Sequence, residues 1–115
     1  MANELLMYVG TYTESIKFGT GDTFEGKGKG IYSFRVDLST GKLEQIGCTE
    51  EVINPSYLTV NPAGTSLYAV NEMKEYEGLR SGSISSFALD RSSGQLMFLN
   101  KQPSYGTDPC HIIVD

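Results

Sequence analysis

Apolar and polar side chains alternate with the two-residue period of a β-strand along much of this chain. The stretch IYSFRVD (31–37) is typical, because it alternates and is rich in β-branched and aromatic residues. Similar stretches are SYLTV (56–60), SLYAVN (66–71), GSISSFALD (82–90) and QLMFLNK (95–101). Glycine-containing turns separate them, and no segment has the 3.6-residue period of an amphipathic helix. The pattern therefore predicts an all-β fold.

Several of these stretches occur twice, in the same order and about fifty residues apart. In the pair 31–46 and 84–99, the same Ile, Ser, Phe, Asp, Ser, Gly and Leu occur at matching positions. The paired segments are 31–46 with 84–99, 54–61 with 108–115, and 6–13 with 66–73. A period of about this length indicates a repeat architecture.

Each repeat corresponds to four strands, named A to D in chain order. Four antiparallel strands that recur radially about every fifty residues form the blade of a β-propeller. We expect strands B to D of the first blade within 5–50, strands A to D of the second within 54–103, and the start of a third at 108–115. The fold class predicted is thus a β-propeller of four-stranded antiparallel blades.

The number of blades indicates a part of a larger ring. A propeller closes with about four to eight blades, and residues 1–115 provide little more than two. We expect this chain to be the N-terminal part of a single propeller domain whose remaining blades are its partners. Because the chain begins at a strand B, the C-terminus would provide the innermost strand of the first blade.

Charge and composition exclude several classes of function. The formal net charge is -5 and no basic stripe is present, which argues against nucleic acid. No apolar run approaches a membrane span, and the N-terminus lacks a secretory signal. Cys48 and Cys110 lack C-x-x-C spacing, so reduced thiols in a cytoplasmic protein are expected. With one histidine, we expect no metal and no other cofactor.

A near match to a phosphate-binding loop occurs in GTGDTFEGKGKG (19–30). Gly21, Gly26 and Lys27 fit the P-loop pattern, but Gly28 replaces the hydroxyl residue that would bind magnesium. A strand pattern follows instead of a helix. The stretch is therefore expected to be a loop, and its role depends on what lies beside it.

Antiparallel strand order predicts which loops lie together. The A–B and C–D turns share one end of a blade and are short, whereas the B–C and D–A loops share the other end. The long loops are 13–29, 48–55, 72–81 and 103–110. Insertions on one face of a repeat protein usually mark its binding face, so we place function at this end, the mouth of the channel.

Several polar and aromatic residues are predicted at the mouth. His111, at the start of a strand A, is a candidate general base, because imidazole titrates near neutral pH. Glu72, after a strand B, would orient it. Thr11, Tyr12 and Asn71 are candidate substrate contacts. The alternatives are a structural histidine, a solvated carboxylate and tyrosines that only pack. The cations at this end are Lys27, Lys29, Lys74 and Arg80, none of which is singled out.

The order of these motifs resembles the seven-bladed propeller lactonase family, typified by the 6-phosphogluconolactonases of bacteria. The motifs are YVGTYT, GIYSFRVDLSTGKLE, NPSYLTVNPAGTSLYAVNE, GSISSFALDRSSGQL and DPCHIIVD. The resemblance covers almost the whole chain except the loop at 14–29. Its PCH element falls on Pro109, Cys110 and His111, and its VNE element on Val70, Asn71 and Glu72.

The resemblance implies a lactone hydrolase that opens a sugar lactone, 6-phosphogluconolactone, in the oxidative pentose phosphate pathway. Further histidine and arginine residues of such a site would lie in later blades. The family also includes enzymes that cyclise carboxymuconate, and a propeller that only binds a partner or a sugar stays open as a third possibility.

Overall fold

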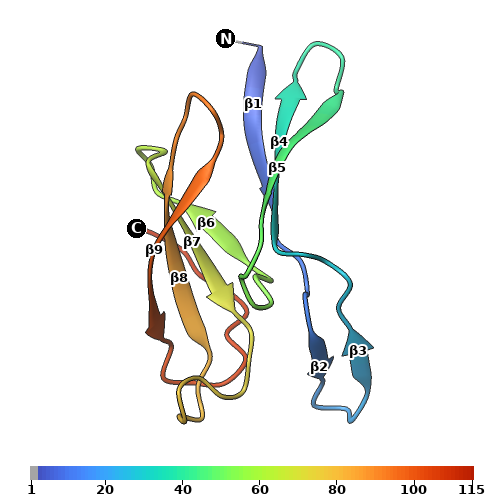
Figure 1. Cartoon of the computed structure of the whole chain (residues 1–115), viewed down its shortest axis with the longest axis vertical. Coiled ribbons are helices and arrows are strands. Elements are labelled where there is room, and N and C mark those ends of the chain that lie inside the picture. Colours follow the sequence, from blue (N-terminus) through green and yellow to red (C-terminus); the bar gives the residue numbers. More distant parts are fainter. Residues whose placement is uncertain (1–2) are drawn as a thin grey trace.

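The structure is a computed structural model that describes residues 3–115, all of whose strands pair antiparallel. Three strands form the first blade, and β4 lies between the other two (Figure 1). These strands are β1 (Glu4–Val9), β4 (Ile31–Asp37) and β5 (Leu43–Thr49). The first blade thus has three strands in the described residues, and its place within a single larger propeller domain stays a prediction.

The second blade is a sheet of four strands in chain order. Its strands are β6 (Leu58–Val60), β7 (Ser66–Asn71), β8 (Ser83–Leu89) and β9 (Leu96–Pro103). Each strand pairs with the next, and the two ends of the sheet are β6 and β9. The all-β fold and the four-stranded antiparallel blade are therefore confirmed.

The long loop of the first blade differs from the expectation, because it contains a hairpin. Strands β2 (Ser15–Lys17) and β3 (Thr23–Glu25) pair with each other and with no other described strand. The turn between them is closed by the Phe18 amide, which donates to the Asp22 carbonyl at 2.8 Å. The prediction that 19–30 is entirely loop was wrong, since three-residue strands are too short to show a period.

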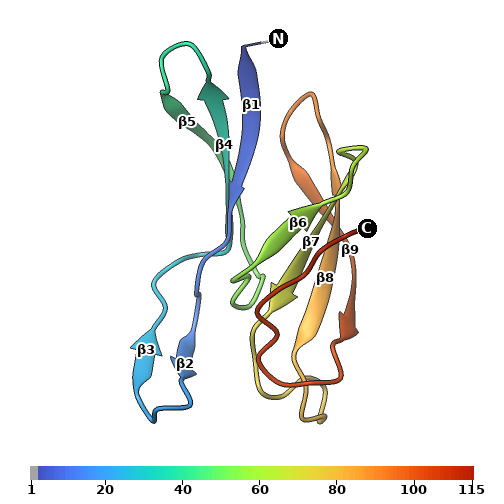
Figure 2. The ribbon, with the colours of Figure 1, turned by 180° about the vertical axis from the view of Figure 1, so that it is seen from behind.

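The last segment of the chain has no strand. Residues 104–115 run beside the β6 side of the second blade (Figure 2). The ring of His111 lies 4.6 Å from the ring of Tyr57, which precedes β6. A third blade starting at 108–115 therefore stays a prediction.

The sequence repeat reappears as repeated local geometry. Both C–D turns begin with an aspartate whose Oδ1 accepts the backbone amide and the hydroxyl of a serine two residues later, Ser39 for Asp37 and Ser92 for Asp90. Each turn ends in a glycine with positive φ. The strand pairs β4–β5 and β8–β9 also share a register shift at the matching Ser–Phe step. The two segments thus adopt one conformation as well as one pattern.

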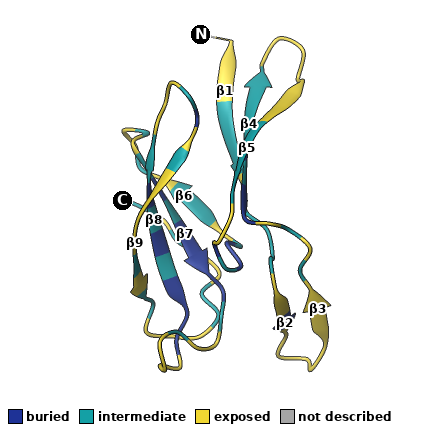
Figure 3. Cartoon of the chain, in the orientation of Figure 1, coloured by how far each residue is buried: buried dark blue, intermediate teal, exposed yellow. Residues whose placement is uncertain are grey.

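The two blades pack on each other through an apolar core. Its fully buried members are Ile31, Val52, Leu67, Ala69 and Phe87. Figure 3 shows that β7 and β8 carry more buried positions than any other strand. A hydrogen bond also crosses the blade boundary, from the Tyr8 hydroxyl to the Gly94 carbonyl at 2.8 Å. This packing fixes the loops of the first blade against those of the second.

The long loops lie at one end of the molecule and the tight turns at the other. Figure 1 shows the β2–β3 hairpin, the β7–β8 loop and the segment after β9 together at the lower end. Among residues 3–115, no helix is long and apolar enough to cross a membrane.

Candidate functional site

Three side chains from separate segments meet at the end that carries the long loops. The Tyr12 hydroxyl donates to Glu72 Oε1 at 2.9 Å, and Ser56 Oγ donates to the same oxygen at 2.7 Å. Tyr12 belongs to the loop after β1, Ser56 precedes β6, and Glu72 directly follows β7. Glu72 is only 9% exposed. This arrangement, the Tyr12–Ser56–Glu72 cluster, joins the two blades.

Only one of the two Glu72 carboxylate oxygens accepts hydrogen bonds from the described residues. Both hydrogen bonds reach Oε1, and within the part of the chain that the structure describes no donor reaches Oε2. A carboxylate oxygen in this state can accept a hydrogen bond from water or from a substrate hydroxyl. The cluster therefore holds the carboxylate in one orientation and leaves one of its oxygens available.

Tyr12 is held as a neutral phenol. Burial raises the pKa of its hydroxyl above the usual value, and the hydrogen bond to the Glu72 carboxylate raises it further. Its ring also packs edge-to-face on Phe24 of the hairpin, with the ring centroids 5.7 Å apart. At neutral pH the side chain is therefore a hydrogen-bond donor with a fixed position.

His111 lies at the same end but does not contact this cluster by a hydrogen bond. It is exposed, and its ring stacks at a tilt of 44° on Tyr57. The orientation of His111 by Glu72, as predicted, is not seen: Glu72 accepts from Tyr12 and Ser56 instead. The catalytic role of both residues stays a prediction.

Asn71 lies in the interior and not on the open surface. It is 0% exposed, its amide nitrogen donates to the Ile53 carbonyl at 2.9 Å, and its amide oxygen accepts from Ser83 and Ser85. All of its polar atoms are thus used by the fold. This geometry favours a structural role over the predicted substrate contact.

Thr11 also has a local partner. Its hydroxyl donates to the Gly30 carbonyl at 2.7 Å and so ties the two ends of the β1–β4 loop together. A Cβ at Gly28 would lie 2.1 Å from that hydroxyl, so glycine is needed there for the close approach. Thr11 shapes the loop, and its predicted contact with substrate stays untested.

A polar groove of about 350 Å³ opens beside the cluster. Its walls come from the β2–β3 hairpin and from the loop after β7, and Glu72 and Asn54 lie at its inner end. Lys17 and Lys74 line it together with acidic residues, and the Lys74 ammonium is paired with the Asp108 carboxylate. The other Asp108 oxygen, Oδ1, is buried and has no hydrogen-bond partner among residues 3–115.

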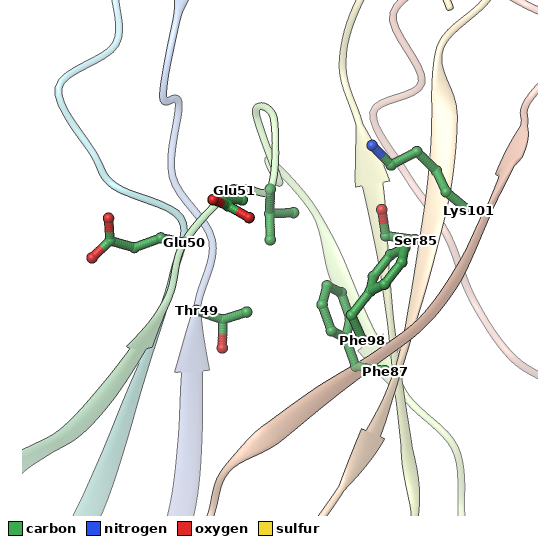
Figure 4. Close-up of a pocket in the computed structure, with 8 residues that line it drawn as sticks. Thr49, Glu50, Glu51, Ser85, Phe87, Phe98 and Lys101 are labelled. Atoms are coloured by element: carbon green, nitrogen blue, oxygen red, sulfur yellow. The ribbon is translucent and has the colours of Figure 1, made fainter.

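A second cavity, of about 210 Å³, lies between the blades (Figure 4). Thr49, Glu50 and Glu51 line it on the side of the first blade. Phe87, Phe98 and Lys101 lie across from them on the second. None of the predicted site residues lines it. Across residues 3–115, no group of three or more His, Cys, Asp or Glu side chains could hold a metal ion.

Two residues of this region were not among the predicted site residues. The contact of Ser56 with Glu72 depends on tertiary packing, which the local sequence around Ser56 does not reveal. Asn54 is 3% exposed, and its side chain bonds both blades. The Asn–Pro pair that opens a repeat was the one signal available.

Similarity to known proteins agrees with this architecture. The model of the seven-bladed β-propeller lactonase family matches residues 6–115. A 6-phosphogluconolactonase of Bacillus subtilis is 34% identical over 108 residues, which cover 94% of this chain and 26% of that protein.

Two solved structures show the same similarity in three dimensions. That of a candidate 6-phosphogluconolactonase from Bacteroides fragilis has a TM-score of 0.80 and 37% identity, and covers 98% of this chain and 27% of that one. That of a periplasmic gluconolactonase from Pseudomonas aeruginosa has a TM-score of 0.70 and 30% identity, and covers 90% and 26%.

Fold and comparisons together define the class of protein. Two antiparallel blades packed face to face are a segment of a β-propeller. The chain belongs to the seven-bladed β-propeller lactonase family. It spans about a quarter of the length of the relatives it matches.

Proposed function

We propose that this chain forms two blades of a lactone hydrolase whose substrate is a sugar lactone, 6-phosphogluconolactone. The observation that carries the proposal is the match of residues 6–115 to the lactonase family, with relatives of that name. A role in the oxidative pentose phosphate pathway would follow from that substrate. The Tyr12–Ser56–Glu72 cluster at the end with the long loops supports a site there.

Hydrolysis of a lactone needs three functions from the protein. A base accepts a proton from the attacking water, donors stabilise the oxyanion that forms at the carbonyl oxygen, and the ring oxygen receives a proton as the ester bond breaks. We assign the first function to His111, which is exposed and accessible to water. Glu72 Oε2 would hold the water or a sugar hydroxyl, and Tyr12 and Ser56 keep that carboxylate in place.

The phosphate of the substrate would bind at the lysines of the groove beside the cluster, which acidic residues also line. Lys17 and Lys74 line it, and cationic groups within reach of a phosphate stabilise its charge. Lys74 is already paired with Asp108, so a phosphate would compete with that carboxylate. Arginines on other blades would complete such a subsite.

Purified full-length protein tests this proposal. We expect it to open 6-phosphogluconolactone faster than the spontaneous reaction and to act on the unphosphorylated gluconolactone more slowly. Turnover of carboxymuconate without lactone opening would favour the cyclase of the same family. Tight binding of a sugar without turnover of either compound would favour a propeller that only binds.

We also propose that the protein works in the cytoplasm. Cys48 and Cys110 are both free thiols, which suits a reducing compartment. The relative from Pseudomonas aeruginosa is periplasmic, so cell fractionation of the native protein is the decisive measurement.

A further inference from the structure

Asn54 occupies the boundary between the blades, between β5 and β6. Its side chain is buried, and its backbone has a φ of +42°, in the left-handed region that asparagine tolerates better than most residues. A buried amide needs partners for its oxygen and its nitrogen. Those partners come from two different segments of the chain.

The hydrogen bonds of Asn54 reach the chain beside Tyr12 and the chain at Glu72. Its amide oxygen accepts from the backbone amides of Thr13 and Glu14 at 2.9 and 3.0 Å. Its amide nitrogen donates to the Glu72 carbonyl at 3.0 Å. The main chain adds two more bonds, from the Asn54 amide to Thr13 Oγ1 and from the Glu72 amide to the Asn54 carbonyl.

We propose that Asn54 is a positioning residue, which holds Tyr12 and Glu72 in register across the blade boundary. It touches neither the Tyr12 hydroxyl nor the Glu72 carboxylate, but it fixes the backbone on which each is carried. The inference rests on the proposed function only where it concerns turnover. The effect of Asn54 on the position of the Tyr12 hydroxyl does not depend on the proposed function.

The next repeat has a residue in the corresponding position, with a carboxylate in place of the amide. Asp108 matches Asn54 in the repeat, precedes a proline as Asn54 does, and has a φ of +54°. Its amide donates to the Met73 carbonyl at 2.9 Å, and its carboxylate pairs with Lys74. In both repeats, the residue before the proline therefore holds the B–C loop of the preceding blade.

The experiment compares Asn54→Gly with Asn61→Gly in the full-length protein. Glycine accepts the positive φ of residue 54 without strain, so the substitution removes the side-chain bonds alone. Asn61 is the matched control: its amide oxygen accepts from the amides of Thr65 and Ser66, and its nitrogen donates to Thr65 Oγ1. It lies in the β6–β7 turn, at the opposite end of the blade from the site.

We expect both variants to melt at a lower temperature, since each loses a comparable set of hydrogen bonds. Only Asn54→Gly should lower kcat for the lactone, by roughly 10- to 100-fold, because small displacements of catalytic groups have effects of that size. Wild-type kcat in folded Asn54→Gly, or an equal loss in Asn61→Gly, would overturn the proposal.

A second measurement does not depend on turnover. NMR titration of ¹³C-labelled tyrosine, assigned with Tyr12→Phe, follows the Tyr12 hydroxyl, whose pKa is raised by burial and by Glu72. We expect that pKa to fall in Asn54→Gly and to stay unchanged in Asn61→Gly. An unchanged Tyr12 pKa in Asn54→Gly would overturn the proposal, whether or not the protein is a lactonase.

A second pair of variants covers the case in which Asn54→Gly does not fold. Asn54→Asp keeps the oxygen that accepts from Thr13 and Glu14, but it places a carboxylate oxygen against the Glu72 carbonyl in place of a donor. With Asn61→Asp as control for the added charge, the same loss of kcat is expected, and the NMR signal of Tyr12 should change in Asn54→Asp and stay as in wild type in Asn61→Asp. Wild-type values of both would contradict the inference.

Discussion

Glu72 is the residue whose carboxylate links the two blades, because it accepts hydrogen bonds from Tyr12 and Ser56. Glu72→Gln keeps an oxygen that accepts from Tyr12 and Ser56 but removes the charge. We expect turnover of the lactone to fall by roughly 100-fold or more, the size of effect expected when a charged group in the site is lost.

The same variant should change Tyr12 in a defined direction. Burial and then Glu72 raise the pKa of the Tyr12 phenol, so loss of the carboxylate should lower it while burial still holds it above its usual value. NMR titration of labelled tyrosine measures this. An unchanged Tyr12 pKa together with unchanged turnover would show that the carboxylate has neither role.

The predicted residues differ in how well sequence alone could place them. Tyr12 and Glu72 meet although sixty residues separate them, and antiparallel loop order was enough to put both at one end. Asn71 adjoins Glu72 but is buried. The sequence did not show this, because the last residue of a strand can face the interior or solvent with the same alternation of apolar and polar residues. Side-chain direction at a strand end is set by packing.

At the level of elements, the two C–D turns provide a prediction about pH. Hydrogen bonds from Ser92 and Ser93 lower the pKa of Asp90, and those from Ser39 and Thr40 do the same for Asp37. A lowered folded-state pKa stabilises the fold above the unfolded pKa of about 3.9, and that contribution is lost as the pH falls further.

Asp90→Asn tests this at the β8–β9 turn. The amide oxygen of asparagine can keep the hydrogen bonds from Ser92. The contribution to stability that depends on ionisation of Asp90 disappears. As the pH is lowered from about 4 to about 2, we therefore expect the melting temperature of the variant to fall less steeply than that of the wild type. Asp22→Asn, in the hairpin turn, controls for net charge. Parallel curves for wild type and Asp90→Asn would contradict the assignment.

The strands themselves were largely predictable, and the exception is instructive. Stretches of six or seven residues such as β7 and β8 show their period clearly, and glycine marks the turns between them. The β2–β3 hairpin does not, since three residues span only one alternation and most of its side chains are exposed. Such a hairpin is defined by its cross-strand pairs and its turn.

At the scale of the whole molecule, residues 1–115 bury their apolar surface incompletely. Met97 and Leu99 of β9 are 68% and 54% exposed, and Leu5 and Leu43 of the first blade are exposed as well. We expect this segment, expressed alone, to self-associate or to unfold without a sharp transition, because open sheet edges and bare apolar faces pair with other chains. Light scattering after gel filtration decides this. A monodisperse monomer with a cooperative thermal transition would contradict it.

The repeat was the strongest signal of the overall architecture. Two matching C–D segments predicted one blade geometry, and the structure repeats it down to the register shift and the aspartate turn. Closure of the ring depends on contacts that two blades alone do not make. Groups from other blades would face the same mouth.

The central claim is that residues at the mouth of this propeller open a lactone, and His111→Asn in the full-length protein tests it most directly. His111 is exposed and stacks on Tyr57, so its replacement should change stability by about 1 kcal/mol or less. Loss of a general base should lower the turnover number by roughly 10²–10⁴-fold. We therefore predict a variant with a near wild-type melting temperature and that loss of turnover, both measured on one sample. Wild-type turnover in the folded variant would contradict the claim.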